Sequence, residues 1–187
     1  MSARFDARET PLEGLIVIQR QTLSDERGFL SRLFCATDLA AFGWQGPIAQ
    51  LNETATAHKG TVRGLHFQRP PHAEIKLVTC TRGRILDVAV DLRENSPTFL
   101  RHFAVELSED NACSLLIPKG FAHGFQALTD EVRMIYAHSE PYAASAEGGL
   151  NPQDPVLSID WPLPVAGLSP RDAGHPFVSG DYRGVAA

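Results

Sequence analysis

Several residue types are scarce in this chain of 187 residues, and each scarcity excludes a class of protein. The chain has only 3 cysteines. Cys35, Cys80 and Cys113 are odd in number, widely spaced and set in apolar surroundings. We therefore expect them to be reduced and buried, and neither a disulfide framework nor a zinc site is indicated.

Basic residues are also too few for a nucleic-acid binder. The chain carries 17 Lys and Arg against 22 Asp and Glu, a formal net charge of −5. A general nucleic-acid binder has a basic face, so nucleic acid is excluded as a partner. An acidic protein can still bind a phosphorylated ligand where its few cations converge on one site.

Long hydrophobic runs are missing as well. Residues 1–6 hold no apolar signal core, and no stretch has the length of a membrane span. The length suits one domain with a substantial core. We expect a single domain over residues 1–187 that is cytoplasmic and has no membrane partner.

The chain does contain many short apolar runs, separated by turn residues. This spacing is typical of a β-sandwich or barrel and not of alternating strands and helices. A short helix is expected between Thr37 as N-cap and Gly43 as its end. After Tyr142 the chain is rich in Pro, Gly and Asp, which predicts an irregular segment packed across the sandwich. The expected strands are 15–19, 28–34, 48–54, 62–67, 75–81, 84–91, 101–107, 113–117, 122–128 and 132–138.

Three basic side chains interrupt two of these apolar runs. Arg63, His66 and Lys76 stand in strands too apolar to be half exposed, so they are expected to point into a cavity. A basic cavity with one imidazole suits an anionic substrate and proton transfer. Strict alternation would put Arg63 and His66 on opposite faces, but Gly64 can host a β-bulge that turns both inward.

Two short patterns match the cupin superfamily. Residues 118–124 (PKGFAHG) fit P-x-G-x-x-H, and Gly60 and His66 have the G-x5-H spacing. Metal-binding cupins continue the first pattern as H-x-H with a glutamate shortly after. Here Gln68 replaces the second histidine and Glu74 lies beyond the usual spacing. Two ligands of four are too few for a catalytic metal, so no metal is expected.

Other polar residues have both a functional and a structural interpretation. Asp87 and Asp91 share one strand face, and an aspartate in such an apolar run needs a histidine or arginine partner. Asp91 can simply end the strand. His123 can line a site or brace the entrance to its strand, and Tyr136 taken alone is more often a core residue.

Together these residues resemble the dTDP-4-dehydrorhamnose 3,5-epimerase family, over about residues 11–172. The resemblance implies a metal-free, all-β cupin-type double-stranded β-helix (jelly roll) without a cofactor. It also implies a homodimer in which an N-terminal strand crosses to the partner's sheet. The matching segments are 25–29, 63–68, 76–78, 87–93, 96–98, 117–125, Tyr136, 160–162 and 168–172.

The resemblance implies an isomerase that epimerises a nucleotide-diphosphate-4-keto-6-deoxyhexose at C3, C5 or both, through an enolate, in deoxysugar biosynthesis. It makes His66 the catalytic base, Asp172 its paired carboxylate, Tyr136 the acid on the opposite face of the sugar, and Lys76 the cation near the 4-keto oxygen. The substrate-binding positions that it implies are Arg27, Phe29, Gln50, Asn52, Arg63 and His123.

Departures from the family pattern at Arg32, Leu51, Glu53, Thr54 and Ala137 leave the nucleotide base and the inverted carbon open. Two other functions also stay open. One is a metal-dependent cupin, either a dioxygenase or a sugar isomerase, using His66, His72, Glu74 and His123. The other is a non-catalytic module that binds a sugar nucleotide.

Short N-terminal strands such as 15–19 are expected to leave open edges for another chain.

Overall fold

The computed structural model describes residues 4–186, which are nearly all strand and loop. Two short helices, α1 (Ala36–Ala40) and α2 (Pro170–Ala173), accompany the strands. The strands are β1 (Phe5–Glu9), β2 (Ile16–Arg20), β3 (Thr22–Asp25), β4 (Gly28–Ser31), β5 (Gln50–Thr56), β6 (Val62–Gln68), β7 (Lys76–Arg82), β8 (Arg84–Asp91), β9 (His102–Ser108), β10 (Cys113–Ile117), β11 (Phe121–Ala127), β12 (Val132–His138) and β13 (Glu147–Gly149).

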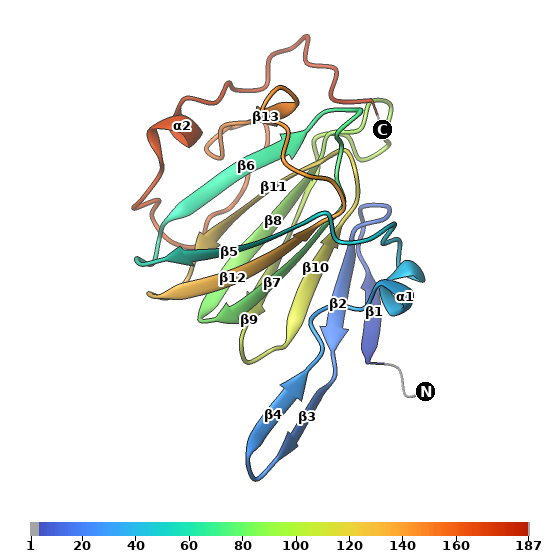
Figure 1. The fold of residues 1–187 in the computed structure, drawn as a ribbon. Coiled ribbons are helices and arrows are strands. Elements are labelled where there is room, and N and C mark those ends of the chain that lie inside the picture. The colour runs from blue at the N-terminus through green and yellow to red at the C-terminus, as the bar shows by residue number, and fades with distance from the viewer. Residues whose placement is uncertain (1–3, 187) are drawn as a thin grey trace.

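These strands build two sheets that pack against each other, as the spacing of the apolar runs predicted. The larger sheet has the order β1-β2-β10-β7-β12-β5 and the smaller one β13-β6-β11-β8-β9. All their strand pairs are antiparallel. Strands β3 and β4 form a separate hairpin that extends away from both sheets (Figure 1).

Side chains of β8 point alternately to the two faces of its sheet and contribute to two hydrophobic clusters. Ile85 and Ala89 face the core between the sheets, while Val88 and Val90 face the other side. There they pack with residues of the C-terminal segment such as Leu157. Side chains alternate with a period of two, so an unbroken apolar strand must be covered on both faces. The segment after Tyr142 supplies that cover, as expected, and adds β13 and α2.

The outer face of the larger sheet has its own cover. Leu39 of α1 and Trp44 pack with Leu77, Leu116 and Ala137 of the sheet. Ala137, one of the departures from the family pattern, is 3% exposed in this cluster. Its small side chain therefore belongs to the packing behind the sheet.

The helix begins earlier than the sequence predicted. Helix α1 starts at Ala36 with Cys35 as N-cap, not at Thr37, and the side chain of Cys35 makes no capping hydrogen bond. Gly43, expected to end the helix, has a φ of 109° and lies in the turn that follows. Arg32, another departure from the family pattern, forms an exposed ion pair of 3.1 Å with Asp38.

The expectation about an open edge at residues 15–19 was wrong. Strand β2 lies between β1 and β10, and the outer strand is β1, which was not predicted. All three cysteines are free, but only Cys80 is buried, while Cys35 and Cys113 are half-buried. Across residues 4–186, no helix is long and apolar enough to cross a membrane.

Candidate active site

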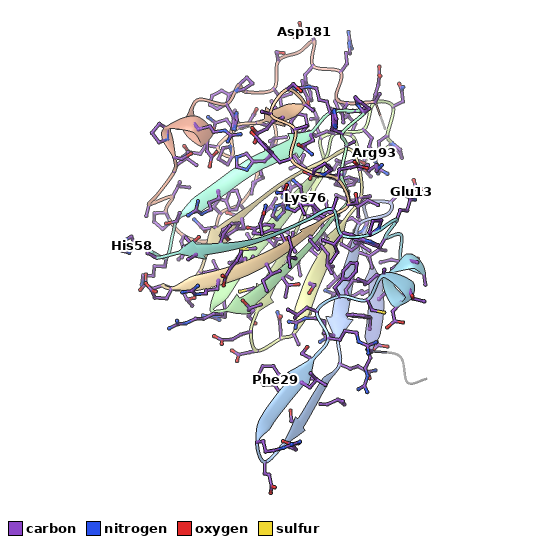
Figure 2. All side chains as sticks on the ribbon, in the orientation of Figure 1. Glu13, Phe29, His58, Lys76, Arg93 and Asp181 are labelled. Carbon is purple, nitrogen blue, oxygen red and sulfur yellow. The ribbon has the colours of Figure 1, made fainter. Side chains whose placement is uncertain are left out.

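A cavity of about 600 Å³ lies among inward-facing side chains of β5, β6, β7, β11 and β12, with the loop before α2 beside it. Figure 2 labels Lys76, the first residue of β7, near the middle of the molecule. Eight of the ten predicted site residues line the cavity, although they come from six separate segments. They are Gln50, Asn52, Arg63, His66, Lys76, His123, Tyr136 and Asp172.

The predicted irregularity at Gly64 is present and brings Arg63 and His66 to one cavity. His66 pairs with His123 and Arg63 with Phe125, so two residues of β6 stand opposite the single Gly124 of β11. Gly64 has a φ of 123°, and a Cβ there would lie 2.6 Å from the Cα of Gly124. This close approach and the positive φ require glycine.

His66 is held by a carboxylate from far along the chain. Its Nε2 lies 2.8 Å from Asp172 Oδ1, and the His66 side chain is 34% exposed while that of Asp172 is 6% exposed. Ser169 caps α2 by accepting from the main-chain N–H of Asp172 at 3.0 Å. Burial lowers the pKa of His66 more than Asp172 raises it, which favours a neutral imidazole.

Lys76 belongs to a second ionic group in the cavity. Its Nζ lies 3.0 Å from Glu74 Oε1 and donates to the main-chain oxygen of His66 at 3.3 Å. His138, the neighbour of Lys76 across β7 and β12, lies 2.8 Å from Glu74 Oε2. Burial alone would raise the pKa of Glu74, but the hydrogen bond to His138 and the charge of Lys76 lower it overall. This carboxylate therefore keeps its charge and holds the ammonium in place.

Asp87 has the histidine partner that the sequence analysis required, and this partner is His123. Its Nε2 lies 2.7 Å from Asp87 Oδ1, with 6% of the His123 side chain exposed and none of Asp87. Burial raises the pKa of Asp87 in spite of His123. Asp91 accepts from Arg93, Ser96 and Thr98 at the end of β8, which is the structural role left open for it.

Tyr136 lies on the larger sheet, opposite the sheet that carries His66. Its ring is edge-on to that of His123 at 5.9 Å and stacks on that of His138 at 6.3 Å. The phenol donates to Met134 Sδ at 3.4 Å, a weak acceptor that a ligand oxygen in the cavity can replace. Burial raises the pKa of Tyr136, so the phenol keeps its proton at neutral pH.

Polar side chains of β5 and β6 complete the wall of the cavity. Gln50 donates to Asn52 Oδ1 at 3.2 Å, and both stand at alternate positions of β5. Arg63 donates to Thr56 Oγ1 at 3.1 Å and to the main-chain oxygen of Ala55 at 3.3 Å. These bonds orient the guanidinium while leaving donors available for an anion.

Two predicted substrate residues do not reach this cavity. Arg27 and Phe29 lie on the β3–β4 hairpin, which Figure 2 shows below the sandwich at the label of Phe29. Arg27 forms an exposed ion pair with Asp25. Phe29 and Leu30 are 74% and 69% exposed. In a single chain, neither predicted residue can therefore contact a ligand bound beside His66.

The residues of the metal-dependent alternative are used in other ways. His66 and His123 are each bonded to an aspartate, and Glu74 to Lys76 and His138. Gln68, at the position of the second cupin histidine, donates to main-chain oxygens of His72 and Pro141 at 3.1 and 3.2 Å. It orders the loop beside the cavity.

Sequence reasoning missed several residues of the site. The position of His138 beside Lys76 follows from strand register, which no local pattern encodes, and Glu74 binds both from the segment before β7. At the edge of the cavity, Glu147 of β13 accepts from Tyr142 at 2.8 Å and forms an ion pair with Arg171. Tyr142, Glu147 and Arg171 are spread over about thirty residues, and no sequence pattern indicated that they would meet. His175, beside Asp172, was also not predicted.

Comparison with known proteins places this geometry in a family. The sequence profile described as dTDP-4-dehydrorhamnose 3,5-epimerase matches residues 9–179. The chain is 41% identical over 165 residues to the dTDP-4-dehydrorhamnose 3,5-epimerase of Sinorhizobium fredii, covering 86% of this chain and 83% of that protein. The chain belongs to the dTDP-4-dehydrorhamnose 3,5-epimerase family. The resemblance inferred from the sequence is thereby confirmed.

Solved structures of this family have the same fold. The dTDP-6-deoxy-D-glucose-3,5-epimerase of Legionella pneumophila, in complex with dTDP-4-keto-L-rhamnose, superposes with a TM-score of 0.90 at 34% identity, covering 98% of this chain and 99% of that one. A 3'-monoepimerase of Streptomyces bikiniensis in complex with dTDP-quinovose has a TM-score of 0.83 at 35% identity, covering 90% and 85%. The two packed antiparallel sheets are the predicted cupin-type jelly roll.

Proposed function

We propose that this protein epimerises a nucleotide-diphosphate-4-keto-6-deoxyhexose at C3, C5 or both, as a single-domain isomerase of deoxysugar biosynthesis. The observation that carries the proposal is the His66–Asp172 pair on one wall of the cavity, with Tyr136 on the other sheet. Inversion next to a ketone needs a base on one face of the sugar and an acid on the other. Membership of the epimerase family supplies the substrate class.

In this proposal His66 removes the proton. Its Nε2 is occupied by Asp172 at 2.8 Å, so Nδ1 is the nitrogen left to accept the proton from carbon. A base must be neutral to act, and the lowered pKa of His66 supports that state. The Asp172 carboxylate then stabilises the imidazolium that forms, because the two atoms are within direct hydrogen-bond distance.

Negative charge moves from carbon to the 4-keto oxygen as the enolate forms. Lys76 is the cation for that oxygen in our proposal. Its ammonium is almost buried, at 9% exposure of the side chain, and is held by Glu74. A preorganised charge in a cavity of low dielectric stabilises a developing oxyanion more than a mobile surface lysine does. No metal or organic cofactor takes part in this step.

Tyr136 returns a proton to the opposite face. The phenol is protonated at neutral pH, and it donates to a weak sulfur acceptor, Met134 Sδ, at 3.4 Å. Arg63 and His123 are assigned to the diphosphate and sugar, and Gln50 and Asn52 to the nucleotide and sugar. All four line the cavity.

The test is proton exchange with solvent. The protein is incubated in D2O with dTDP-, UDP- and GDP-linked 4-keto-6-deoxyglucose, and deuterium at C3 and C5 is read by NMR. We expect deuterium and inversion at one or both carbons with at least one nucleotide. Binding without exchange would leave only a non-catalytic module, and activity lost with a stoichiometric metal on dialysis would favour a metal-dependent cupin.

We also propose a homodimer in which the hairpin of one copy reaches the cavity of the other. A two-stranded hairpin is marginally stable alone in water, and this one exposes Leu23, Phe29 and Leu30. The predicted ligand contacts of Arg27 and Phe29 need a cavity that their own chain does not offer them. A second copy is the occupant that satisfies both conditions.

Light scattering tests the dimer. The wild type should be dimeric at micromolar concentration, and Leu30→Glu should shift it toward monomer because it places a charge on the apolar hairpin. Glu26→Gln, a polar change on the same hairpin turn, is the control and should remain dimeric. A stable wild-type monomer would overturn the proposal.

A further inference from the structure

Three side chains of types that can ligate a metal converge at one end of the cavity. His66, Asp172 and His175 each offer a nitrogen or oxygen atom, and these three atoms all lie within 4.8 Å of one another. His66 comes from β6, while Asp172 and His175 come from α2 and the turn after it. Figure 1 shows α2 beside the strand β6 that carries His66.

His175 has no function in the proposed epimerisation, yet the structure holds it firmly. Its side chain is 14% exposed, and its Nε2 is buried without a hydrogen-bond partner among the described residues. The ring lies against Gly149, where an added Cβ would stand 2.3 Å from ring atoms. A buried imidazole nitrogen without a partner is unfavourable, so a ligand there would satisfy an unmet donor or acceptor.

The charge at this point also suits a cation. Asp172 is nearly buried, and its ionic partners among residues 4–186 are the two imidazoles, His66 at 2.8 Å and His175 at 3.8 Å. Glu74, by contrast, has the permanent cation Lys76 at 3.0 Å. A carboxylate oxygen and two ring nitrogens therefore lie together here, and both atom types are ligands that zinc accepts.

We propose that His66, Asp172 and His175 bind a Zn²⁺ ion, and that this ion inhibits the enzyme. Two imidazoles and one carboxylate form a donor set that zinc accepts, with the remaining position open to water. Zinc bonds of about 2.0–2.1 Å at tetrahedral angles place ligand atoms about 3.3 Å apart. Two of the three separations, 2.8 and 3.8 Å, lie on either side of that value, and the third is no more than 4.8 Å. Small rotations of the side chains would therefore close the site.

Inhibition follows from which nitrogen the metal takes. This part of the inference rests on the proposed function, in which His66 accepts a proton. A neutral imidazole bound to zinc through Nε2 carries its proton on Nδ1, so it has no lone pair left for the substrate. A zinc ion bound to Asp172 also prevents this carboxylate from stabilising a His66 imidazolium.

Calorimetric titration of the metal-free full-length protein with zinc tests the site. The wild type should bind one ion per chain. His175→Gln keeps a polar side chain of similar length but offers an amide in place of the imidazole. Because even changes behind a metal ligand cost about 10–100-fold in affinity, loss of this ligand should weaken binding by about 100-fold or more. His58→Gln removes an exposed histidine elsewhere and should bind as the wild type does.

A second variant guards against misfolding of the first. Gly149→Ala keeps every histidine, but its Cβ would displace the ring of His175. It should also weaken zinc binding. Undiminished zinc binding by both His175→Gln and Gly149→Ala would overturn the proposal, as would a wild type that binds no zinc at millimolar concentration.

Activity separates this inference from the proposed function. Each variant's exchange rate is expressed relative to its own zinc-free rate. Stoichiometric zinc should inhibit the wild type and His58→Gln, and leave His175→Gln uninhibited. A wild type that epimerises fully with zinc bound would refute the inhibition and leave the proposed function intact. Zinc binding by a protein without any exchange activity would refute the proposed function instead.

Discussion

Two histidines face each other across β6 and β11, and each is bonded through Nε2 to an aspartate. His66 and His123 are cross-strand partners, and their distances to Asp172 and Asp87 are 2.8 and 2.7 Å. The surroundings of the two pairs differ. The side chain of His66 is 34% exposed to the cavity and its aspartate comes from α2, whereas the His123–Asp87 pair is buried and comes from adjacent strands of one sheet.

This difference teaches that a hydrogen bond alone does not make a histidine a base. Burial raises the pKa of Asp87, which disfavours its charged form and weakens its ability to stabilise an imidazolium. His66 has space in front of it for a substrate carbon. We expect His66 to move protons and His123 to hold the ligand and the wall of the cavity.

The largest expected effect on catalysis comes from replacing each of the two histidines by alanine. His66→Ala should lower both deuterium incorporation and inversion by about 10⁴-fold, the upper end of what a positioned base contributes, because no enolate forms. His123→Ala should weaken substrate binding more than turnover and should still incorporate deuterium. Both are read by NMR in D2O. Equal loss of exchange in the two variants would break the comparison.

Tyr136→Phe should separate proton removal from proton return. The ring remains but the phenolic donor is lost, so deuterium should still enter with retained configuration. Inversion should fall by about 10³-fold, within the range for a lost general acid. The measurement is the ratio of exchanged to inverted product. A Tyr136→Phe enzyme that inverts at the wild-type rate would reduce this tyrosine to a core residue.

For stability the order of the two pairs should be the reverse of that for catalysis: loss of Asp87 should cost more unfolding free energy than loss of Asp172. Asp87→Ala leaves His123 buried without its partner and should cost about 2 kcal/mol of unfolding free energy. Asp172→Ala should cost less, because water in the cavity can replace the carboxylate beside the partly exposed His66. Urea denaturation measures both. A larger loss for Asp172→Ala would show that the His66–Asp172 pair is the structural one.

The smallest effect concerns Glu74, whose pKa is shifted in the direction opposite to that of Asp87. Two positive or hydrogen-bonding partners, Lys76 and His138, lower the pKa of Glu74 in the folded protein. Its stabilising contribution is therefore present above its ordinary pKa and is lost as pH falls through the lowered one.

Glu74→Gln should accordingly be less stable than the wild type by about 1 kcal/mol near neutral pH, with the gap closing at acidic pH. Denaturation curves between pH 3 and pH 7 test this window. Glu53→Gln, which removes an exposed ion pair with Arg133, should change stability by less than about 0.5 kcal/mol throughout. A gap for Glu74→Gln that widens as pH falls would contradict the sign of the shift.

The sequence by itself determined the strands and the faces that they present. Period-two alternation and turn residues are local, so β8, β10 and β12 were predicted with their observed bounds. The bulge at Gly64 was also predicted, because strict alternation would put Arg63 and His66 on opposite faces of the strand. The pairing of His66 with Asp172, which are 106 positions apart, came from family resemblance and not from any local pattern.

Only the tertiary structure decided which strands are neighbours and in what register. Register brought His138 beside Lys76, and packing of α2 on β6 brought His175 beside Asp172. The tertiary structure also places β2 in the interior of its sheet, and it places Arg27 and Phe29 outside the cavity of their own chain. These outcomes depend on burial of apolar surface between segments far apart in the chain, a non-local free energy that no short stretch of sequence contains.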